Sequence, residues 1–258
     1  MAEERNQEEI MKDIIELQAD ELLITGAILV LIGSLTSALS ITNIFLTRSQ
    51  QGGEGFALGH GIESIGNTFH VAGKEKQLSI EPIEPRFTGM LGSATQALAN
   101  MGIAVTVQKG LSIGLFDLSD MDDMDGEENG MNGGQAGESE LKEEQLRRIL
   151  ILYAILSAIQ SFGAYTEGYS ILRVPPFETQ QLEATGDYIT ALGAAIEIGA
   201  ISLELQEQEL LGIFITVIAS WIQFIGSSIG FYSITTQGTL NQQEFDEKYR
   251  YSYSRYTT

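Results

Sequence analysis

An eight-residue pattern recurs six times along this chain and limits the possible folds more than any other feature. The copies are GSLTSALS (33–40), GHGIESIG (59–66), GSATQALA (92–99), LSAIQSFG (156–163), GDYITALG (186–193) and ASWIQFIG (219–226). Positions one and eight are mostly small, position five is always polar, and position seven is always apolar. Because two helical turns take about seven residues, the small residues share one helical face. A strand would scatter them over both faces, so the pattern predicts helices.

Small residues on one helical face allow two helices to approach closely. Glycine inside a helix costs roughly 1 kcal/mol relative to alanine, so its recurrence indicates that helix packing offsets this cost. We expect the flanking Ile and Leu side chains to fill the edges of each seam, and Gln96, Gln160 and Gln223 to hydrogen-bond across it. The predicted seam residues are Gly33, Gly59, Gly66, Gly92, Gly163, Gly186, Gly193, Ala219 and Gly226.

Prolines and one acidic segment divide the predicted helices. The pairs Pro82, Pro85 and Pro175, Pro176 interrupt helices because proline lacks a backbone donor and favours extended geometry before it. Residues 117–144 are rich in Asp, Glu, Gly and Asn, which predicts a disordered linker.

The chain thus divides into four predicted segments. They are an N-terminal half (1–116) with an acidic amphipathic lead-in and three repeat helices, the linker (117–144), a C-terminal half with three repeat helices (145–236), and a Tyr-rich polar tail (237–258) that is either strand-like or disordered. The predicted fold is all-α, with about six helices in two three-helix halves.

Charge and composition exclude several classes of protein. The chain has 14 Lys and Arg against 35 Asp and Glu, a net charge of −21, which opposes nucleic-acid binding. It has no cysteine, and therefore no disulfide and no thiolate metal site. Its N-terminus is acidic before the first apolar run, so we expect no cleavable signal peptide.

The hydropathy pattern favours a membrane setting. Residues 22–47 and 210–243 contain no charge, and each stretch can cross roughly 30 Å of hydrocarbon. Residues 149–166 are borderline in length. The helices at 59–73 and 186–205 carry ionisable residues, which indicates burial rather than contact with lipid. The alternative is a soluble, cytoplasmic bundle that buries its apolar faces by oligomerising.

One polar stripe is the main candidate for chemistry. His60, Glu63, Asn67 and His70 fall on one helical face, but the two histidines are about 15 Å apart along a straight helix and do not share a metal. We expect a polar stripe that faces solvent or a neighbouring helix. The acidic linker lacks the end ligands of a calcium loop, and no nucleophile, base and stabiliser converge. The prediction is no catalytic, cofactor or metal site, and no enzyme.

The motifs ASWIQFIGSSIG and GHGIESIGNTFHVAG resemble a group of uncharacterised proteins from Bacillus-like bacteria with repeats of the type Gly-x-Trp-Ile-Gln-Ala-Ile-Gly. This resemblance implies helical repeats and no established activity. We predict a non-catalytic, membrane-associated helical protein with a structural or assembly role that associates with itself. The alternative is a soluble homo-oligomeric bundle that binds an apolar ligand or a partner helix. The sequence identifies no small-molecule ligand.

Overall fold

The fold is all-α, as predicted. The computed structural model describes residues 2–116, 136–175, 177 and 179–254. Within these residues it contains six α-helices and one short 3-10 turn. They are α1 (Ala2–Thr47), the 3-10 turn η1 (Gln50–Gly52), α2 (Gly53–Ile80), α3 (Glu84–Leu111), α4 (Ala136–Ile171), α5 (Gln180–Glu204) and α6 (Glu209–Ser254).

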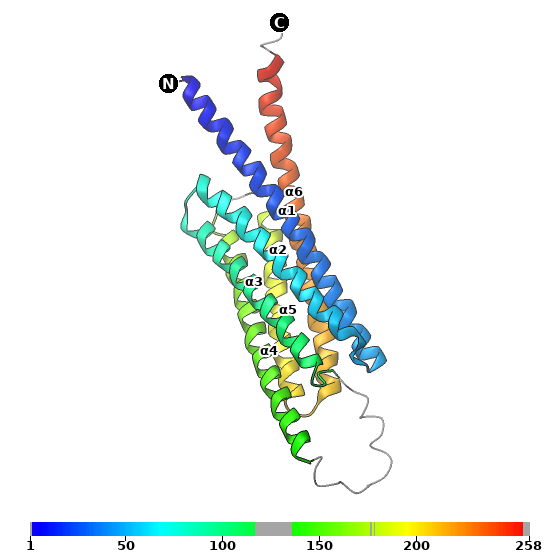
Figure 1. The fold of residues 1–258 in the computed structure, drawn as a ribbon. Helices are drawn as coiled ribbons and strands as arrows, with labels where there is room; N and C mark the ends of the chain where they lie inside the picture. Colours follow the sequence, from blue (N-terminus) through cyan, green and yellow to red (C-terminus); the bar gives the residue numbers. More distant parts are fainter. Residues whose placement is uncertain (1, 117–135, 176, 178, 255–258) are drawn as a thin grey trace.

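The six helices form one closed ring. Each helix packs against its neighbour in sequence, and α6 closes the ring against α1. Successive helices run in opposite directions, so both termini lie at one end, where α1 and α6 project beyond the other helices (Figure 1). We call this the stalk end, and the opposite end the linker end. The two predicted halves adjoin along α3–α4 and along α1–α6, and therefore share one ring.

The ends of the helices follow the sequence signals. Pro82 lies between α2 and α3, and Pro85 occupies the first turn of α3, where a missing backbone donor costs nothing. Pro175 lies between α4 and α5. The acidic lead-in is continuous with α1, and α6 continues as a helix through most of the predicted tail.

The predicted linker is only partly described. Its residues 117–135 lie outside the described residues, as do 255–258 of the predicted tail. Residues 136–144, also assigned to the linker, form the first turns of α4.

Contacts between glycines bring the helices together as three pairs. Glycine faces glycine at Gly33–Gly59 and Gly26–Gly66 between α1 and α2, at Gly92–Gly163 between α3 and α4, and at Gly186–Gly226 between α5 and α6. A Cβ added at Gly33 would lie 2.6 Å from the carbonyl oxygen of Gly59, and one added at Gly186 would lie 2.7 Å from that of Gly226. No side chain fits there unless the backbones separate. All nine predicted seam residues are buried at such contacts.

These contacts make the repeating unit a helical pair. The middle pair, α3 and α4, consists of the helices on either side of the acidic segment. The linker therefore falls within a pair of helices rather than between two independent halves.

The prediction that the flanking Ile and Leu fill the seams is wrong. The six residues at position seven are 50% to 75% exposed: Leu39, Ile65, Leu98, Phe162, Leu192 and Ile225. Position seven lies about 100° around the helix from the seam residue that follows it. When the seam faces the neighbouring helix, position seven therefore points out of the ring.

Polar side chains occupy the interior instead. At position five, Ser37, Glu63, Gln96, Gln160 and Gln223 are buried, and Thr190 is half-buried. Position two is also polar in every copy, a regularity that the sequence analysis missed: Ser34, His60, Ser93, Ser157, Asp187 and Ser220. All of these except the half-buried Asp187 are buried. The ring is thus apolar outside and largely polar inside, the reverse of a water-soluble bundle.

The large apolar side chains of the interior gather mainly at the linker end. Phe56, Ile103, Tyr153, Ile201 and Ile213 are each at most 2% exposed and belong to one cluster with their neighbours. We call this group the apolar cluster. Residues from all six helices contribute to it, so it closes the ring at that end.

At the projecting ends of α1 and α6, residues 9–13 and 248–249 contact each other and form a stalk that lies outside the uncharged stretches 22–47 and 210–243. Lys248 Nζ lies 2.7 Å from Asp13 Oδ2 and 2.9 Å from Glu9 Oε1, and Tyr249 donates a 2.7 Å hydrogen bond to Asp13. Slight burial acts to raise the pKa of Asp13, but the hydrogen bonds from Lys248 and Tyr249 lower it below the ordinary value of 3.8. The same contacts raise the pKa of Lys248.

The seams can be tested within a single helix. We expect Gly186→Ala to destabilise the protein by about 1–3 kcal/mol, because its methyl group would overlap the backbone of α6. Gly199, also in α5, has open space around its Cβ position, so Gly199→Ala should stabilise the helix by up to about 1 kcal/mol. Thermal unfolding in detergent measures both effects. Equal stabilisation by the two substitutions would contradict close packing at the seam.

The stalk contacts predict a pH dependence. Because the pKa of Asp13 is lowered, its contribution is present above its ordinary value of 3.8 and is lost as pH falls through the lower folded-state value. Spin labels on cysteines at Met11 and Glu247 should give a narrow distance distribution at pH 7 that broadens in acid. Lys248→Met should broaden it at pH 7, whereas Lys142→Met at the linker end should not. A distribution that stays narrow in Lys248→Met would show that the ion pair does not hold the stalk together.

Candidate functional site

The polar interior of the ring consists of two groups of interacting side chains. The central network lies next to the apolar cluster, and its members are His60, Glu63, Asn100, Tyr153, Ser157, Gln160, Glu197 and Gln223. The ionic cluster lies nearer the stalk end and comprises His70, Lys74, Gln96, Glu167, Glu183 and Asp187. Each member except Lys74 lies in an octet or within four residues of one.

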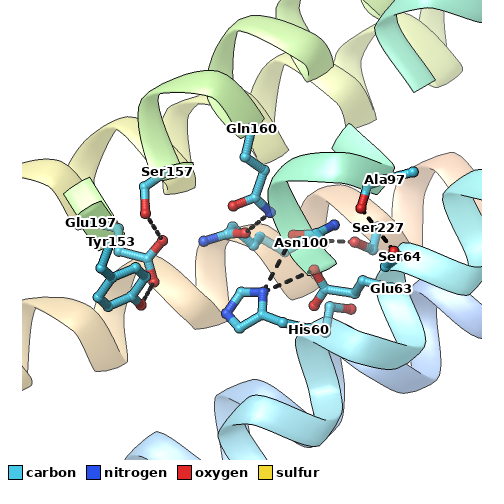
Figure 2. A network of polar contacts seen from close by, with 12 residues as sticks. His60, Glu63, Ser64, Ala97, Asn100, Tyr153, Ser157, Gln160, Glu197 and Ser227 are labelled. Atoms are coloured by element: carbon cyan, nitrogen blue, oxygen red, sulfur yellow. Dashed lines mark hydrogen bonds and ion pairs between the residues drawn. The ribbon is translucent and has the colours of Figure 1, made fainter. Parts of the chain in front are cut away.

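The members of the central network come from five helices, α2 to α6. Figure 2 shows their side chains gathered between these helices. The Nδ1 atom of His60 lies 3.3 Å from Asn100 Oδ1 and 3.5 Å from the carboxylate of Glu63. Gln160 donates a 3.1 Å hydrogen bond to Gln223, which links α4 to α6. Buried polar groups of this kind need partners, and most of these find them on a neighbouring helix.

Glu197 has the lowest exposure of the interior carboxylates, at 0%. Tyr153 donates a 2.5 Å hydrogen bond to its Oε1 atom, and Ser157 donates a 3.0 Å bond to Oε2 (Figure 2). Both donors come from α4, one turn apart. These bonds fix α5 against α4 immediately above the apolar cluster.

The ionic cluster is built around a buried ion pair. Lys74 on α2 contacts Glu167 on α4 directly, and both side chains are buried. Lys74 also donates a 3.0 Å hydrogen bond to Ser93, while Gln96 donates a 2.6 Å bond to Glu167. The Nδ1 atom of His70 lies 3.9 Å from the same carboxylate. Glu167 is therefore well satisfied in the interior.

Two further carboxylates, Glu183 and Asp187, lie one helical turn apart on α5 and share a small cavity with Glu167. Asp187 Oδ2 is buried and has no hydrogen-bond partner among the described residues. The same holds for the Nε2 atoms of His70 and His60. The interior thus contains polar atoms that the helices described here leave unsatisfied.

The structure shows where the residues of the predicted polar stripe lie. His60, Glu63, Asn67 and His70 are all buried and face the ring interior, so the stripe faces other helices rather than solvent. His60 belongs to the central network and His70 to the ionic cluster. Within the part of the chain that the structure describes, no three His, Asp or Glu side chains are arranged to hold a metal ion.

The predicted glutamine pairing across the seams is found only in part. Gln160 and Gln223 do pair, but they join α4 to α6 across the ring rather than across a seam. Gln96 bonds across the α3–α4 seam, but to Glu167 instead of to another glutamine. The sequence analysis missed Lys74, Glu167 and Glu183 as interior residues. Glu167 carried a signal, because it is the only charged residue between Arg148 and Arg173 in an otherwise apolar helix.

Comparisons with known proteins identify a family for part of the chain. Residues 137–231 match a family of unknown function (DUF6944). The match covers most of α4, all of α5 and the first half of α6, and so includes three of the six octets. No curated protein and no solved structure matches the chain significantly.

The buried ion pair predicts a large effect of single substitutions. We expect Lys74→Met to lower the free energy of unfolding by about 3–5 kcal/mol, because it leaves Glu167 charged and uncompensated. The double variant Lys74→Met/Glu167→Gln should lose less than the sum of the two single variants. Arg148→Met serves as a control, since its pair with Glu144 is exposed and contributes about 0–1 kcal/mol. Unfolding in mixed micelles measures these values, and additive losses would argue against a coupled pair.

Proposed function

We propose that the protein is an integral membrane protein whose six helices cross the bilayer together as one ring, with a non-catalytic role in structure or assembly. The observation that carries this proposal is the reversed pattern of the repeats. Every copy directs its apolar position seven outward, and five of the six copies bury the polar position five. In lipid the outer surface needs no further cover, and polar groups find partners only inside.

Helix length and hydropathy support the same conclusion. Among the described residues, four helices are long and apolar enough to cross a membrane: Gln7–Thr47, Glu140–Ile171, Gln180–Glu204 and Glu209–Tyr249. These belong to α1, α4, α5 and α6. The shortest of them, with 25 residues, is about 38 Å long and exceeds a hydrocarbon core of about 30 Å.

Helices α2 and α3 are not among these four. Of their charged residues, Glu63 and Lys74 point into the ring, where each has a partner, and the exposed ones lie in the first or last turns of the helices. The outer faces of the two helices carry Ile65, Leu98 and Val105, which are 50%, 75% and 62% exposed. Both helices can therefore lie against lipid as members of the ring, although neither would be expected to insert alone.

A structural or assembly role is proposed because no group of side chains converges for catalysis in the residues described above. Self-association is part of this proposal, and the acidic stalk offers a surface for it outside the uncharged stretches. An apolar ligand in the middle of the ring is less well supported, since it would lie against the central network.

A soluble homo-oligomer is the second candidate, and the same exposed side chains bear on it. In water, the outward Leu, Ile and Phe residues on all six helices would have to be covered by other copies. The protein would then be cytoplasmic rather than in the cell membrane. The two proposals therefore differ in what contacts position seven.

Cell fractionation and spin labelling separate these candidates. We expect the protein to remain in carbonate-washed membranes and to be released by detergent. A nitroxide on Leu98→Cys should collide more often with oxygen than with a water-soluble nickel complex, and one on Lys142→Cys should show the reverse. Recovery in the supernatant, with the label at residue 98 immobilised between copies, would overturn the membrane proposal.

A further inference from the structure

Two cavities lie in line at the stalk end of the ring. The larger, of about 220 Å³, is lined by Asp20, Lys74, Arg86 and Glu183 among others. The smaller, of about 40 Å³, lies deeper and is lined by His70, Glu167, Glu183 and Asp187 together with uncharged polar residues and apolar ones such as Val30 and Phe231. Glu183 and Ile234 line both cavities, so the two adjoin at these residues.

The smaller cavity is large enough for a hydrated ion. A water molecule needs about 10–15 Å³ of such space, so the cavity accommodates about three waters, or a small cation with part of its hydration shell. Neutral oxygen atoms are available in the wall from Asn67, Gln96 and Thr190. Oxygen ligands of this kind suit hard inorganic cations.

The charges around this cavity do not balance. Lys74 is committed to Glu167, and within the described residues neither Glu183 nor Asp187 lies within ion-pair distance of a Lys or Arg side chain. Two carboxylates thus remain without a cation in the interior. Both side chains are half-buried, so each carboxylate loses part of its hydration, which is unfavourable unless a proton or a cation neutralises it.

Two unsatisfied atoms, one on a carboxylate and one on a histidine, point to a ligand in the smaller cavity. Asp187 Oδ2 is buried without a partner, as is Nε2 of His70, a residue that is only 8% exposed. A carboxylate oxygen can only accept, so a cation or a donor from its hydration shell is the complement that it needs. Water held by the same ion can satisfy the histidine nitrogen.

We propose that the smaller cavity binds a small inorganic cation, with the carboxylates of Asp187 and Glu183 as its charged ligands, and that the cation enters from the stalk end through the larger cavity. The charged groups that surround this route are Glu16 and Asp20 on α1, His70 and Lys74 on α2, Arg86 on α3 and Glu167 on α4, whereas α6 contributes only uncharged residues, among them Ser227, Gln237 and Asn241.

The route is open at one end only. Carboxylates outnumber cationic groups along it, which favours entry of a cation over an anion. At the linker end the apolar cluster fills the ring, and an ion would have to lose its hydration shell to pass it. This site does not depend on whether lipid or other copies cover the outside of the ring.

Thermal unfolding of the purified full-length protein in detergent tests the site. Ionic strength and pH are held constant, and NaCl or MgCl₂ replaces N-methyl-D-glucamine chloride, whose cation is too large for the cavity. We expect Na⁺ or Mg²⁺ to raise the unfolding midpoint by about 2–4 °C. Asp187→Asn should abolish this rise, and Glu75→Gln, which removes an exposed carboxylate from α2, should retain it.

A second measurement keeps the test independent of how the variants fold. Equilibrium dialysis of the unaltered protein against radioactive sodium, with and without excess magnesium, should show saturable binding of at least one of the two ions. Midpoints that are the same in sodium, magnesium and glucamine salts, together with no saturable binding, would mean that protons alone neutralise the carboxylates and would overturn the proposal. A rise that persists in Asp187→Asn would also overturn it.

Discussion

The close approach of glycine to a facing backbone carbonyl is the contact on which the rest of this structure depends. At three seams, one in each helical pair, a single added carbon would lie within 3.0 Å of the opposite chain. Such contacts leave little freedom in how a helix is rotated about its own axis, because only the glycine face fits. Once the glycine face is fixed against the neighbouring helix, the direction in which every other octet position points is fixed as well. The octet thus encodes helix orientation rather than a hydrophobic core.

That orientation explains why polarity is reversed in this ring. With position eight at the seam, position seven turns outward, while positions two and five turn inward in most copies. Interior polar groups then have to satisfy one another, and Lys74 with Glu167, Gln160 with Gln223, and Tyr153 with Glu197 do so between helices. These bonds add specificity to seams that are otherwise built only from small residues. The seams position the helices within each pair, and the polar contacts connect different pairs, in two of these three cases between helices that are not adjacent in the ring.

Much of the fold was predictable from the sequence, because helices, breaks and seams are local patterns. Glycine spacing predicted the seam residues, and the prolines marked the boundaries of α3 and α5. The direction of position seven was predicted wrongly, since the sequence was interpreted with the hydrophobic side inward. The site was harder to predict. Lys74 and Glu167 are 93 residues apart, and only the closed ring brings them together. Likewise, the environment of Asp187 depends on residues from α2, α4 and α6, which no local pattern on α5 reveals.

The unequal interior of the ring has an electrical consequence in a bilayer. If the ring spans a bilayer as proposed, water and ions in the stalk-end cavities would carry the potential of that side as far as those cavities extend. Most of the voltage would then fall over the packed part of the ring that includes the apolar cluster of Phe56, Ile103 and Tyr153. A unit charge that crossed the whole drop would gain or lose about 2.3 kcal/mol per 100 mV. The insulating layer of the protein would thus be much thinner than the bilayer, and the electric field would be concentrated near the linker end.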